Sequence, residues 1–307
     1  MIERLNLRVI NSSAKHVVGS ETEYKIDKRV FIPFTGSTIF FGTAETGIPV
    51  AIKFSAVQGG SRKEWIGLTK AYSAGVPTPK PLCLAEDITG FQALVSERVD
   101  GVPLYLSPQE ELKQQLGRIV REMHNRVLVD GREWAKSGKG DFTYYDRYIL
   151  YWLKESTGGL GRGSRTLVLL QKLTDAMRNY CNTISPVFNH NDIHNGQVLV
   201  RKNRTLAIID FENWKEESPL NEIATYLFHS TRTNASIQGF KNFIDGYSGN
   251  SPLTERDKET LMFYLLFVSA RAVGYFQSTG SDYLEKAREN HQMILNFLDG
   301  EHIWKLT

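Results

Sequence analysis

The sequence predicts an α+β protein in which strands gather near the N-terminus and helices dominate the rest. Two short apolar runs, 38–42 and 50–54, flank a Glu-Thr-Gly turn as in a β-hairpin, and 91–96 is a third strand-like run. Farther along the chain, apolar residues recur at helical spacing. We therefore expect a smaller N-terminal lobe that contains an antiparallel sheet, followed by a larger, mostly helical C-terminal lobe.

The N-terminal lobe is expected to contain one more strand and one main helix. Residues 30–32 form an apolar run that Pro33 ends, which is typical of an edge strand. The helix is expected at 62–73, where Trp65 and Leu68 begin an apolar series with helical spacing. This lobe therefore combines a sheet with a single helix.

The C-terminal lobe is expected to begin with a helix that Ser107 caps and that ends near His124. An insertion at about 125–187 follows, with two helical patterns separated by the glycine-rich segment 158–165. Because that segment follows a helix rather than a strand, it is interpreted as a linker and not as a phosphate-binding loop. Further helices are expected after residue 218 and at 238–247, 255–277 and 283–297.

Composition is that of an ordinary globular protein. Of 307 residues, 41% are hydrophobic and 23% charged, and the net charge of +3 is too balanced to indicate a nucleic-acid partner. Cys83 and Cys181 lack metal-binding spacing. Neither a signal peptide nor an apolar run of the roughly 20 residues needed to span a bilayer is present, so we expect a cytoplasmic protein, with peripheral membrane contact left open.

The stretch 190–212, HNDIHNGQVLVRKNRTLAIIDFE, concentrates the side chains suited to phosphate chemistry. Phosphoryl transfer needs a carboxylate to orient the attacking hydroxyl and oxygen ligands for Mg²⁺. Asp192, Gln197 and Asp210 supply such groups. Because 198–209 is interpreted as a β-hairpin, its two ends should bring these side chains to one edge.

HNDIHNGQ resembles the catalytic loop of the protein-kinase-like superfamily, above all its aminoglycoside phosphotransferase and choline kinase branch, whose usual form is H-G-D-L-H-P-G-N. IIDFE is similar to the metal-binding segment of that branch. The resemblance implies a bilobal protein-kinase-like fold, with ATP or GTP and Mg²⁺ as cofactors. It implies Asp192 as the base, His194 as a contact of the transferred phosphate, and Gln197 and Asp210 as Mg²⁺ ligands. Gln197 replaces the usual asparagine, as it does in bacterial maltose kinases.

VAIK at 50–53 resembles the strand that carries the nucleotide-binding lysine of kinases. The resemblance implies that Lys53 binds nucleotide phosphates and that Glu64, from the following helix, pairs with it. The alternatives are a solvated lysine at a strand end and a glutamate that compensates the helix dipole.

Two further segments resemble the nucleotide site of kinases. Gly36 lies seventeen positions before Lys53 (53 − 36), which matches the last glycine of the phosphate loop, so amides near Ser37 are expected to cradle phosphate. FQALVSERVDG resembles the hinge between lobes. It implies that the backbones of Glu97 and Val99 bind adenine. It also implies that the nucleotide-binding lobe covers residues 1–99 and the catalytic and acceptor-binding lobe residues 100–307.

Two residues near this stretch are expected to support it rather than react. Glu222 replaces the aspartate of the branch's D-P-x-x-D-L-A segment, and we expect it to hold the catalytic loop from a buried position. His190 is interpreted as a structural residue of the same loop.

Three functions remain open at this stage. The first is a phosphotransferase that moves the γ-phosphate to a hydroxyl of a small molecule or glycan. The second is a pseudokinase that binds nucleotide or a partner without transfer. The third is a protein Ser/Thr kinase, which the helical insertion and the lack of an A-P-E-like segment disfavour. Aminoglycosides, choline-like amines, maltose-like sugars and lipopolysaccharide-core sugars all remain candidate acceptors, and the sequence does not indicate an oligomeric state.

Overall fold

The chain forms two compact units. The first contains Met1–Ser107 and Gly196–Trp214, and the second Pro108–Asn195 and Lys215–Thr307. The predicted boundary after residue 99 stays a prediction. The computed structural model describes residues 3–12, 18–32, 36–107, 109–140, 142–147, 165–178, 181–231, 237–249, 251–280 and 282–299.

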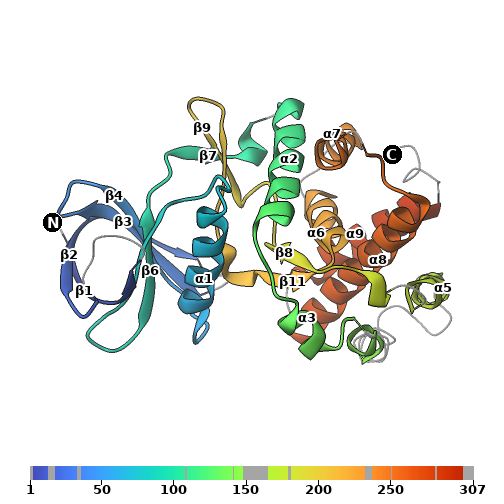
Figure 1. The fold of residues 1–307 in the computed structure, drawn as a ribbon, viewed down its shortest axis with the longest axis horizontal. Coiled ribbons are helices and arrows are strands. Elements are labelled where there is room, and N and C mark those ends of the chain that lie inside the picture. Colours follow the sequence, from blue (N-terminus) through green and yellow to red (C-terminus); the bar gives the residue numbers. More distant parts are fainter. Residues whose placement is uncertain are drawn as a thin grey trace. The chain divides into compact units, whose positions relative to one another are not determined.

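The first unit is built around a closed six-stranded antiparallel barrel (Figure 1). Alternate side chains of its strands point inward, and Tyr24, Val50, Ile52 and Val95 are fully buried in its core. The strands, in barrel order, are β1 (Glu3–Ser12), β2 (Glu21–Ile32), β3 (Ser37–Ala44), β4 (Pro49–Phe54), β6 (Gln92–Glu97) and β5 (Pro81–Glu86).

The predicted hairpin and strands of this unit are confirmed. β3 and β4 are joined by the turn in which Gly47 has a φ of 80° and donates its amide to the Ala44 carbonyl (2.8 Å). The expected edge strand at 30–32 is the end of β2, where the pairing to β3 continues while the pairing to β1 stops at Ile26. That segment is therefore an edge locally, within an otherwise closed barrel.

Helix α1 (Gly60–Ser73), at the place predicted, packs on β5 and β6 and on the short 3₁₀ helix η3 (Phe211–Asn213) (Figure 1). Trp214 follows η3 and lies against Gly67, where a Cβ atom would overlap the indole. The indole Nε1 donates to the Lys63 carbonyl oxygen (2.8 Å). A chain segment far away in sequence is thereby held against α1.

That distant segment arrives through a small sheet that completes the first unit. β9 (Val198–Arg201) pairs antiparallel with β10 (Leu206–Ile208), which confirms the predicted hairpin. On its other side β9 pairs with β7 (Gly101–Pro103), a strand the sequence did not indicate, and the 3₁₀ helix η1 (Leu104–Leu106) follows β7. The hairpin leads directly into Asp210 and η3.

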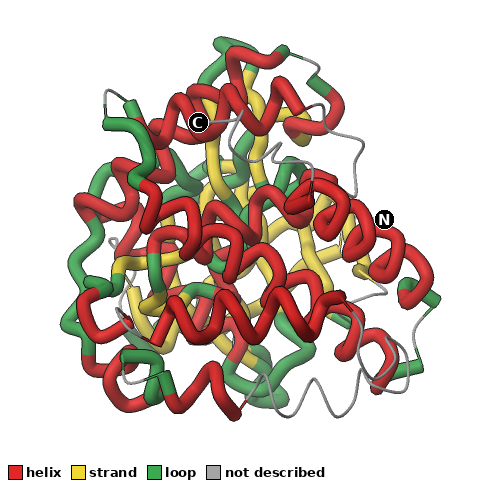
Figure 2. The backbone as a smooth tube through the Cα atoms, turned by 90° about the vertical axis from the view of Figure 1, so that its right-hand side faces the viewer, coloured by secondary structure: helices red, strands yellow, loops and turns green. Residues whose placement is uncertain are grey.

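The second unit is mainly helical (Figure 2). Its core surrounds α8, of which Phe263, Tyr264 and Leu266 are fully buried. A two-stranded sheet of β8 (Val187–Asn189) and β11 (Lys215–Glu217) lies before α6. The helices are α2 (Glu110–Arg126), α3 (Arg132–Ser137), α5 (Arg165–Arg178), α6 (Pro219–Thr231), α7 (Ile237–Ser248), α8 (Glu255–Ser278) and α9 (Leu284–Asp299), with the 3₁₀ helix η2 at Cys181–Thr183.

The start of α2 corrects one expectation. Ser107 does not take the cap position of this helix but ends η1, where its amide donates to the Leu104 carbonyl (2.9 Å). Gln109 takes the cap position without a side-chain capping hydrogen bond, and the helix begins at Glu110. His124, at the other end, contacts the Tyr247 hydroxyl through Nδ1 (2.9 Å), in keeping with the structural role expected for it.

The predicted insertion is described in part. It contains α3, a helical turn at 143–147 and α5, whose range agrees with the second helical pattern. Most of the first pattern and the glycine-rich segment 158–164 lie outside the described residues.

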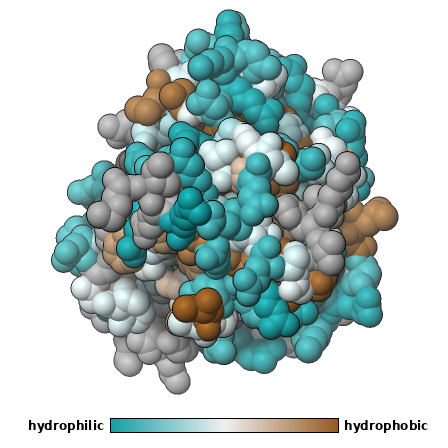
Figure 3. All heavy atoms as spheres, turned by 90° about the vertical axis from the view of Figure 1, so that its left-hand side faces the viewer, coloured by the Kyte–Doolittle hydropathy of each residue, from teal (hydrophilic) through white to brown (hydrophobic). Residues whose placement is uncertain are grey.

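Two further properties of the structure are the polarity of its surface and the lengths of its helices. The face drawn in Figure 3 is mostly hydrophilic, with apolar side chains scattered across it, as is normal for folded proteins. Within the part of the chain that the structure describes, no helix has the length and apolar character needed to cross a membrane.

Candidate active site

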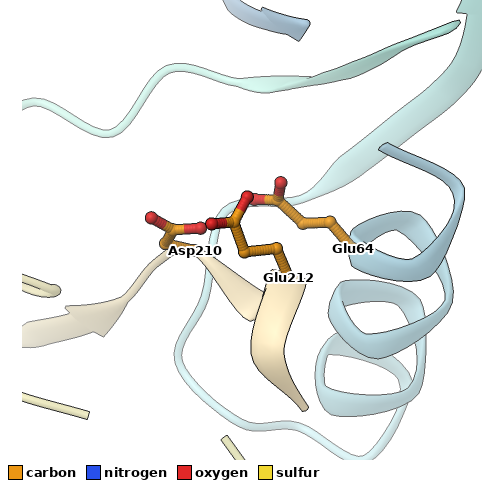
Figure 4. Close-up of side chains that lie close together, drawn as sticks. All are labelled: Glu64, Asp210 and Glu212. Atoms are coloured by element: carbon orange, nitrogen blue, oxygen red, sulfur yellow. The ribbon is translucent and has the colours of Figure 1, made fainter. Parts of the chain in front are cut away.

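Lys53 stands at the centre of an acidic cluster in the first unit. Its strand, β4, lies between β3 and β6, and its Nζ lies 3.0 Å from Glu64 Oε2, 2.6 Å from Asp210 Oδ1 and 3.0 Å from Glu212 Oε2. Only 11% of the lysine side chain is exposed. Figure 4 shows the three carboxylates turned toward one another, so the ammonium group neutralises charges that would otherwise repel.

These contacts decide between the two interpretations of Lys53 and Glu64, a buried ion pair or two separate surface residues. Lys53 is not a solvated strand-end lysine, and Glu64 is 4% exposed and lies beyond the first turn of α1, so it does not serve the helix dipole from the surface. Burial alone would lower the pKa of Lys53, but Glu64, Asp210 and Glu212 outweigh it and raise that pKa. Burial raises the pKa of Glu64 to about 8, against the opposing effect of Lys53.

Asp210 lies at the end of the hairpin in an unusual backbone conformation. Its φ of 68° and ψ of 63° are in the left-handed region, which aspartate tolerates better than most residues and which is frequent at functional sites. Gln197, at the start of the same hairpin, donates from Nε2 to Asp210 Oδ2 (2.9 Å). The hairpin thus brings these two predicted metal ligands together, as the sequence indicated.

The other predicted nucleotide contacts lie on the barrel. Gly36 has a φ of 69° and closes the turn before β3 by donating to the Ile32 carbonyl (2.8 Å), and Ser37, the first residue of β3, is buried. Glu97 ends β6 and Val99 follows it, half-buried. Their roles in phosphate and adenine binding stay predictions.

In the second unit, the loop after β8 carries Asp192 and is held by Glu222 from α6. The Glu222 carboxylate is fully buried and accepts the backbone amides of His190 and of Asn191 (3.0 Å to Oε1). This confirms the expected supporting role of Glu222. Asn191 has a φ of 64°, so it occupies a conformation in which glycine is free and asparagine is tolerated. That geometry is compatible with asparagine at the position that glycine takes in the H-G-D-L-H-P-G-N motif.

Asp192 is surrounded by imidazoles. His229, from α6, brings Nε2 to 3.3 Å from Asp192 Oδ1, and the rings of His229 and His194 lie 5.3 Å apart. Burial alone would raise the pKa of Asp192, but His229, His194 and His190 together hold it below its usual range. The carboxylate is therefore ionised at neutral pH and able to accept a proton.

Two residues of these clusters were not among the predicted site residues. In the sequence, Glu212 is recognisable only as a part of the DFE motif. Its contact with Lys53 depends on η3, which directs the Glu212 side chain toward the lysine. His229 carries no motif of its own. The available signal was its position seven residues after Glu222, two helical turns on and on the same face of α6.

The chain belongs to the phosphotransferase enzyme family, whose sequence profile it matches over residues 60–261. It is therefore an enzyme of the kinase class, as the catalytic-loop motifs predicted. No characterised protein matched the chain in a separate sequence comparison.

Solved structures show the same fold at low sequence identity. A choline kinase from Streptococcus pneumoniae is 12% identical, with a TM-score of 0.62 over 90% of this chain and 94% of its own. A choline/ethanolamine kinase family protein from Mesorhizobium loti is 12% identical (TM-score 0.63; 87% and 89% covered). An aminoglycoside phosphotransferase from Alicyclobacillus acidocaldarius is 14% identical (TM-score 0.58; 92% and 91% covered). The predicted α+β, protein-kinase-like fold is confirmed.

Proposed function

We propose that the protein transfers the γ-phosphate of a nucleoside triphosphate, ATP or GTP, to a hydroxyl of a small molecule or glycan. The observation that carries the proposal is the placement of Lys53 against both Glu64 and Asp210 in a chain of this family. An ammonium group held in this way is positioned for phosphate oxygens. A spectinomycin phosphotransferase of the same fold, 13% identical with a TM-score of 0.54, was solved with ADP and spectinomycin, which supports a nucleotide and a small acceptor.

The donor set near Asp210 fits Mg²⁺. Magnesium prefers oxygen ligands, and the Asp210 carboxylate and the Gln197 amide oxygen are such ligands. Since Gln197 already reaches Asp210, its additional methylene, compared with the usual asparagine, does not remove it from the site. Bound Mg²⁺ would neutralise charge on the phosphates.

The chain's own residues then have separate tasks. Lys53, oriented by Glu64, binds phosphate oxygens, and Gly36 and Ser37 contribute backbone contacts to them. The backbones of Glu97 and Val99 bind the base. Asp192 orients the acceptor hydroxyl and takes its proton.

ADP release from ATP and Mg²⁺, measured across a panel of aminoglycosides, choline and ethanolamine, maltose-like sugars and lipopolysaccharide-core sugars, tests the function and identifies the acceptor. Repeating the measurement with GTP gives the nucleotide preference. Asp192→Asn should lower turnover about 10²- to 10⁴-fold, the usual contribution of a general base, while leaving nucleotide binding intact. Full turnover in this variant would refute the mechanism. Nucleotide binding without turnover on any acceptor would instead favour the pseudokinase.

A further inference from the structure

His229 is placed to act on the candidate base through its side chain. It lies in the last turns of α6, and its Nε2 is 3.3 Å from Asp192 Oδ1, with 19% of the histidine side chain and 29% of the aspartate side chain exposed. A contact of this kind in a partly dry environment restricts the carboxylate more than a contact at an open surface. His229 therefore has both the reach and the burial needed to orient Asp192.

The same helix also fixes the backbone that carries Asp192. Glu222, seven residues before His229, accepts the amides of His190 and Asn191. Residues seven positions apart lie two turns along the same face of a helix. One face of α6 thus contacts the loop at two places. Glu222 accepts from the backbone amides of the loop, and His229 contacts the side chain of Asp192.

The charged and titratable groups that face Asp192 come from two elements. His190 and His194 belong to its own loop, and His229 comes from α6, on which Glu222 accepts the backbone amide of Asn191. The Nε2 atom of His229 lies 3.3 Å from Asp192 Oδ1. The ring of His194, 5.3 Å from that of His229, packs beside the pair.

We propose that His229 is a positioning residue for Asp192, donating from Nε2 to Oδ1 and so fixing the orientation in which the carboxylate meets the acceptor hydroxyl. The inference rests on the proposed function. In the transfer step, the acceptor oxygen forms a bond to the γ-phosphorus, and the bond from that phosphorus to the bridging oxygen breaks. The nucleoside diphosphate leaves with the electron pair, and the hydroxyl proton passes to the Asp192 carboxylate.

A purely structural role for the ring is the competing explanation, since His229 also lies 5.3 Å from the Phe228 ring. A positioning role and a purely structural role of His229 predict different effects of substituting this residue. His229→Gln retains an N–H donor with a reach close to that of Nε2, whereas His229→Leu keeps apolar bulk and removes the donor. His291→Gln, which changes a buried histidine that contacts Ser269, serves as the matched control.

The first measurement is a ¹³C NMR titration of the Asp192 carboxyl carbon in the full-length protein. Its signal is assigned by its absence from the spectrum of Asp192→Asn. In His229→Leu the pKa of Asp192 should rise by about one unit, because a donor to the charged form is gone. His229→Gln should show a smaller rise, and His291→Gln none. An Asp192 pKa unchanged in His229→Leu overturns the proposal. Should that variant unfold, His229→Asn, whose amide is too short to reach Oδ1, replaces it.

The second measurement is ADP release from ATP and Mg²⁺, with the best acceptor of the panel or with water. His229→Leu should lower kcat about 10- to 100-fold with little change in the KM for ATP, and His229→Gln should restore most of the loss. In the Asp192→Asn background, His229→Leu should add no further loss. If Asp192→Asn is fully active, the proposed function fails, whereas unchanged kcat in His229→Leu beside an inactive Asp192→Asn refutes only the role of His229.

Discussion

At the scale of single residues, the acidic cluster around Lys53 places three mutually repelling carboxylates close together and therefore needs a cation between them. Three carboxylates from α1 and from the segment after β10 lie within 4.8 Å of one another, which would be unfavourable without a cation. The lysine ammonium is that cation, and it touches all three. Lys53 therefore contributes to the stability of the first unit as well as to the proposed nucleotide site.

Lys53→Met keeps the unbranched side chain and removes the charge. Breaking a buried ion pair costs about 3–5 kcal/mol, and Glu64 can escape part of that cost by taking a proton. In wild type, Glu64 is protonated below its pKa of about 8, and removal of Lys53 raises that pKa further. The loss of stability relative to wild type should therefore be nearly constant up to about pH 8 and grow as the pH rises above it. Urea unfolding at several pH values measures it.

Glu64→Gln in the Lys53→Met background is the control, because the amide cannot ionise. The double variant should show little of the growth with pH and recover part of the lost stability. A penalty that is the same at pH 6 and pH 9 in Lys53→Met would contradict this account.

His291 provides a pH-dependent contribution in the second unit. Burial lowers its pKa from 6.5 to about 4, and its Nδ1 contacts the Ser269 hydroxyl (2.9 Å). The unfolded chain takes up the proton first as the pH falls below 6.5, so the stabilisation by neutral His291 is present above that pH and is lost down to pH 4. Between pH 7 and pH 5 the loss amounts to about 2 kcal/mol.

His291→Gln should therefore be more nearly equal to wild type at pH 5 than at pH 7. The difference in unfolding free energy between the two proteins, from urea denaturation, isolates this effect from the other titrating groups. A difference that does not shrink as the pH falls would show that His291 is accessible to protons in the folded state.

At the scale of elements, the crossing of α2 and α7 depends on two glycines. A Cβ on Gly117 of α2 would overlap the Phe243 carbonyl oxygen, and one on Gly246 of α7 would overlap the Gln114 carbonyl oxygen. Each helix therefore presents a glycine to the backbone of the other. At such a close approach backbone packs against backbone, so no flexible side chain could move aside to accommodate an added methyl group.

Gly246→Ala is expected to destabilise the protein by about 1–3 kcal/mol, the usual range for overpacking, despite the higher helix propensity of alanine. Gly239→Ala, in the same helix, is the matched control. There an added methyl meets the ends of the Lys113 and Glu110 side chains, which can move, so the change should be neutral or stabilising. Thermal unfolding of both variants checks this, and equal behaviour would refute the tight crossing.

Most elements were predictable because their signals are local. The hairpin of β3 and β4 has a glycine turn, and α1, α7, α8 and α9 have apolar residues at helical spacing. β7 and β11, of three residues each, depend on partners far along the chain and carry no pattern of their own. The start of α2 differed because Ser107 was already used to end η1.

The candidate site was predictable to the extent that its residues lie within motifs. Asp192, Gln197 and Asp210 share one stretch of sequence, and the hairpin between the last two joins them. The contact of Lys53 with Glu212 and that of His229 with Asp192 join segments that no periodicity relates. Only the tertiary arrangement within each unit reveals them.

At the scale of the whole molecule, neither unit is a continuous piece of chain. The first unit needs Gly196–Trp214 to supply β9 as the partner of β7, the indole that packs on Gly67, and the carboxylates around Lys53. A cut after residue 107 removes all of these. The first unit is therefore a folding unit only in the presence of a distant segment.

A fragment of residues 1–107 should accordingly unfold without a sharp transition in urea, monitored by circular dichroism. The same fragment joined to residues 196–214 by a Gly/Ser linker should regain a cooperative transition, because the missing contacts lie within the unit. Equal cooperativity of the two fragments would show that the barrel and α1 suffice.

The left-handed backbone of Asn191 and Asp210 has a consequence for which substitutions can survive. In a saturation library sorted for folded protein alone, both positions should favour glycine, asparagine and aspartate and reject β-branched residues. Sorting the same library for turnover should keep the tolerance at Asn191 and abolish it at Asp210. Comparing the two sorts would separate the residue that shapes the chain, Asn191, from the residue that performs chemistry, Asp210.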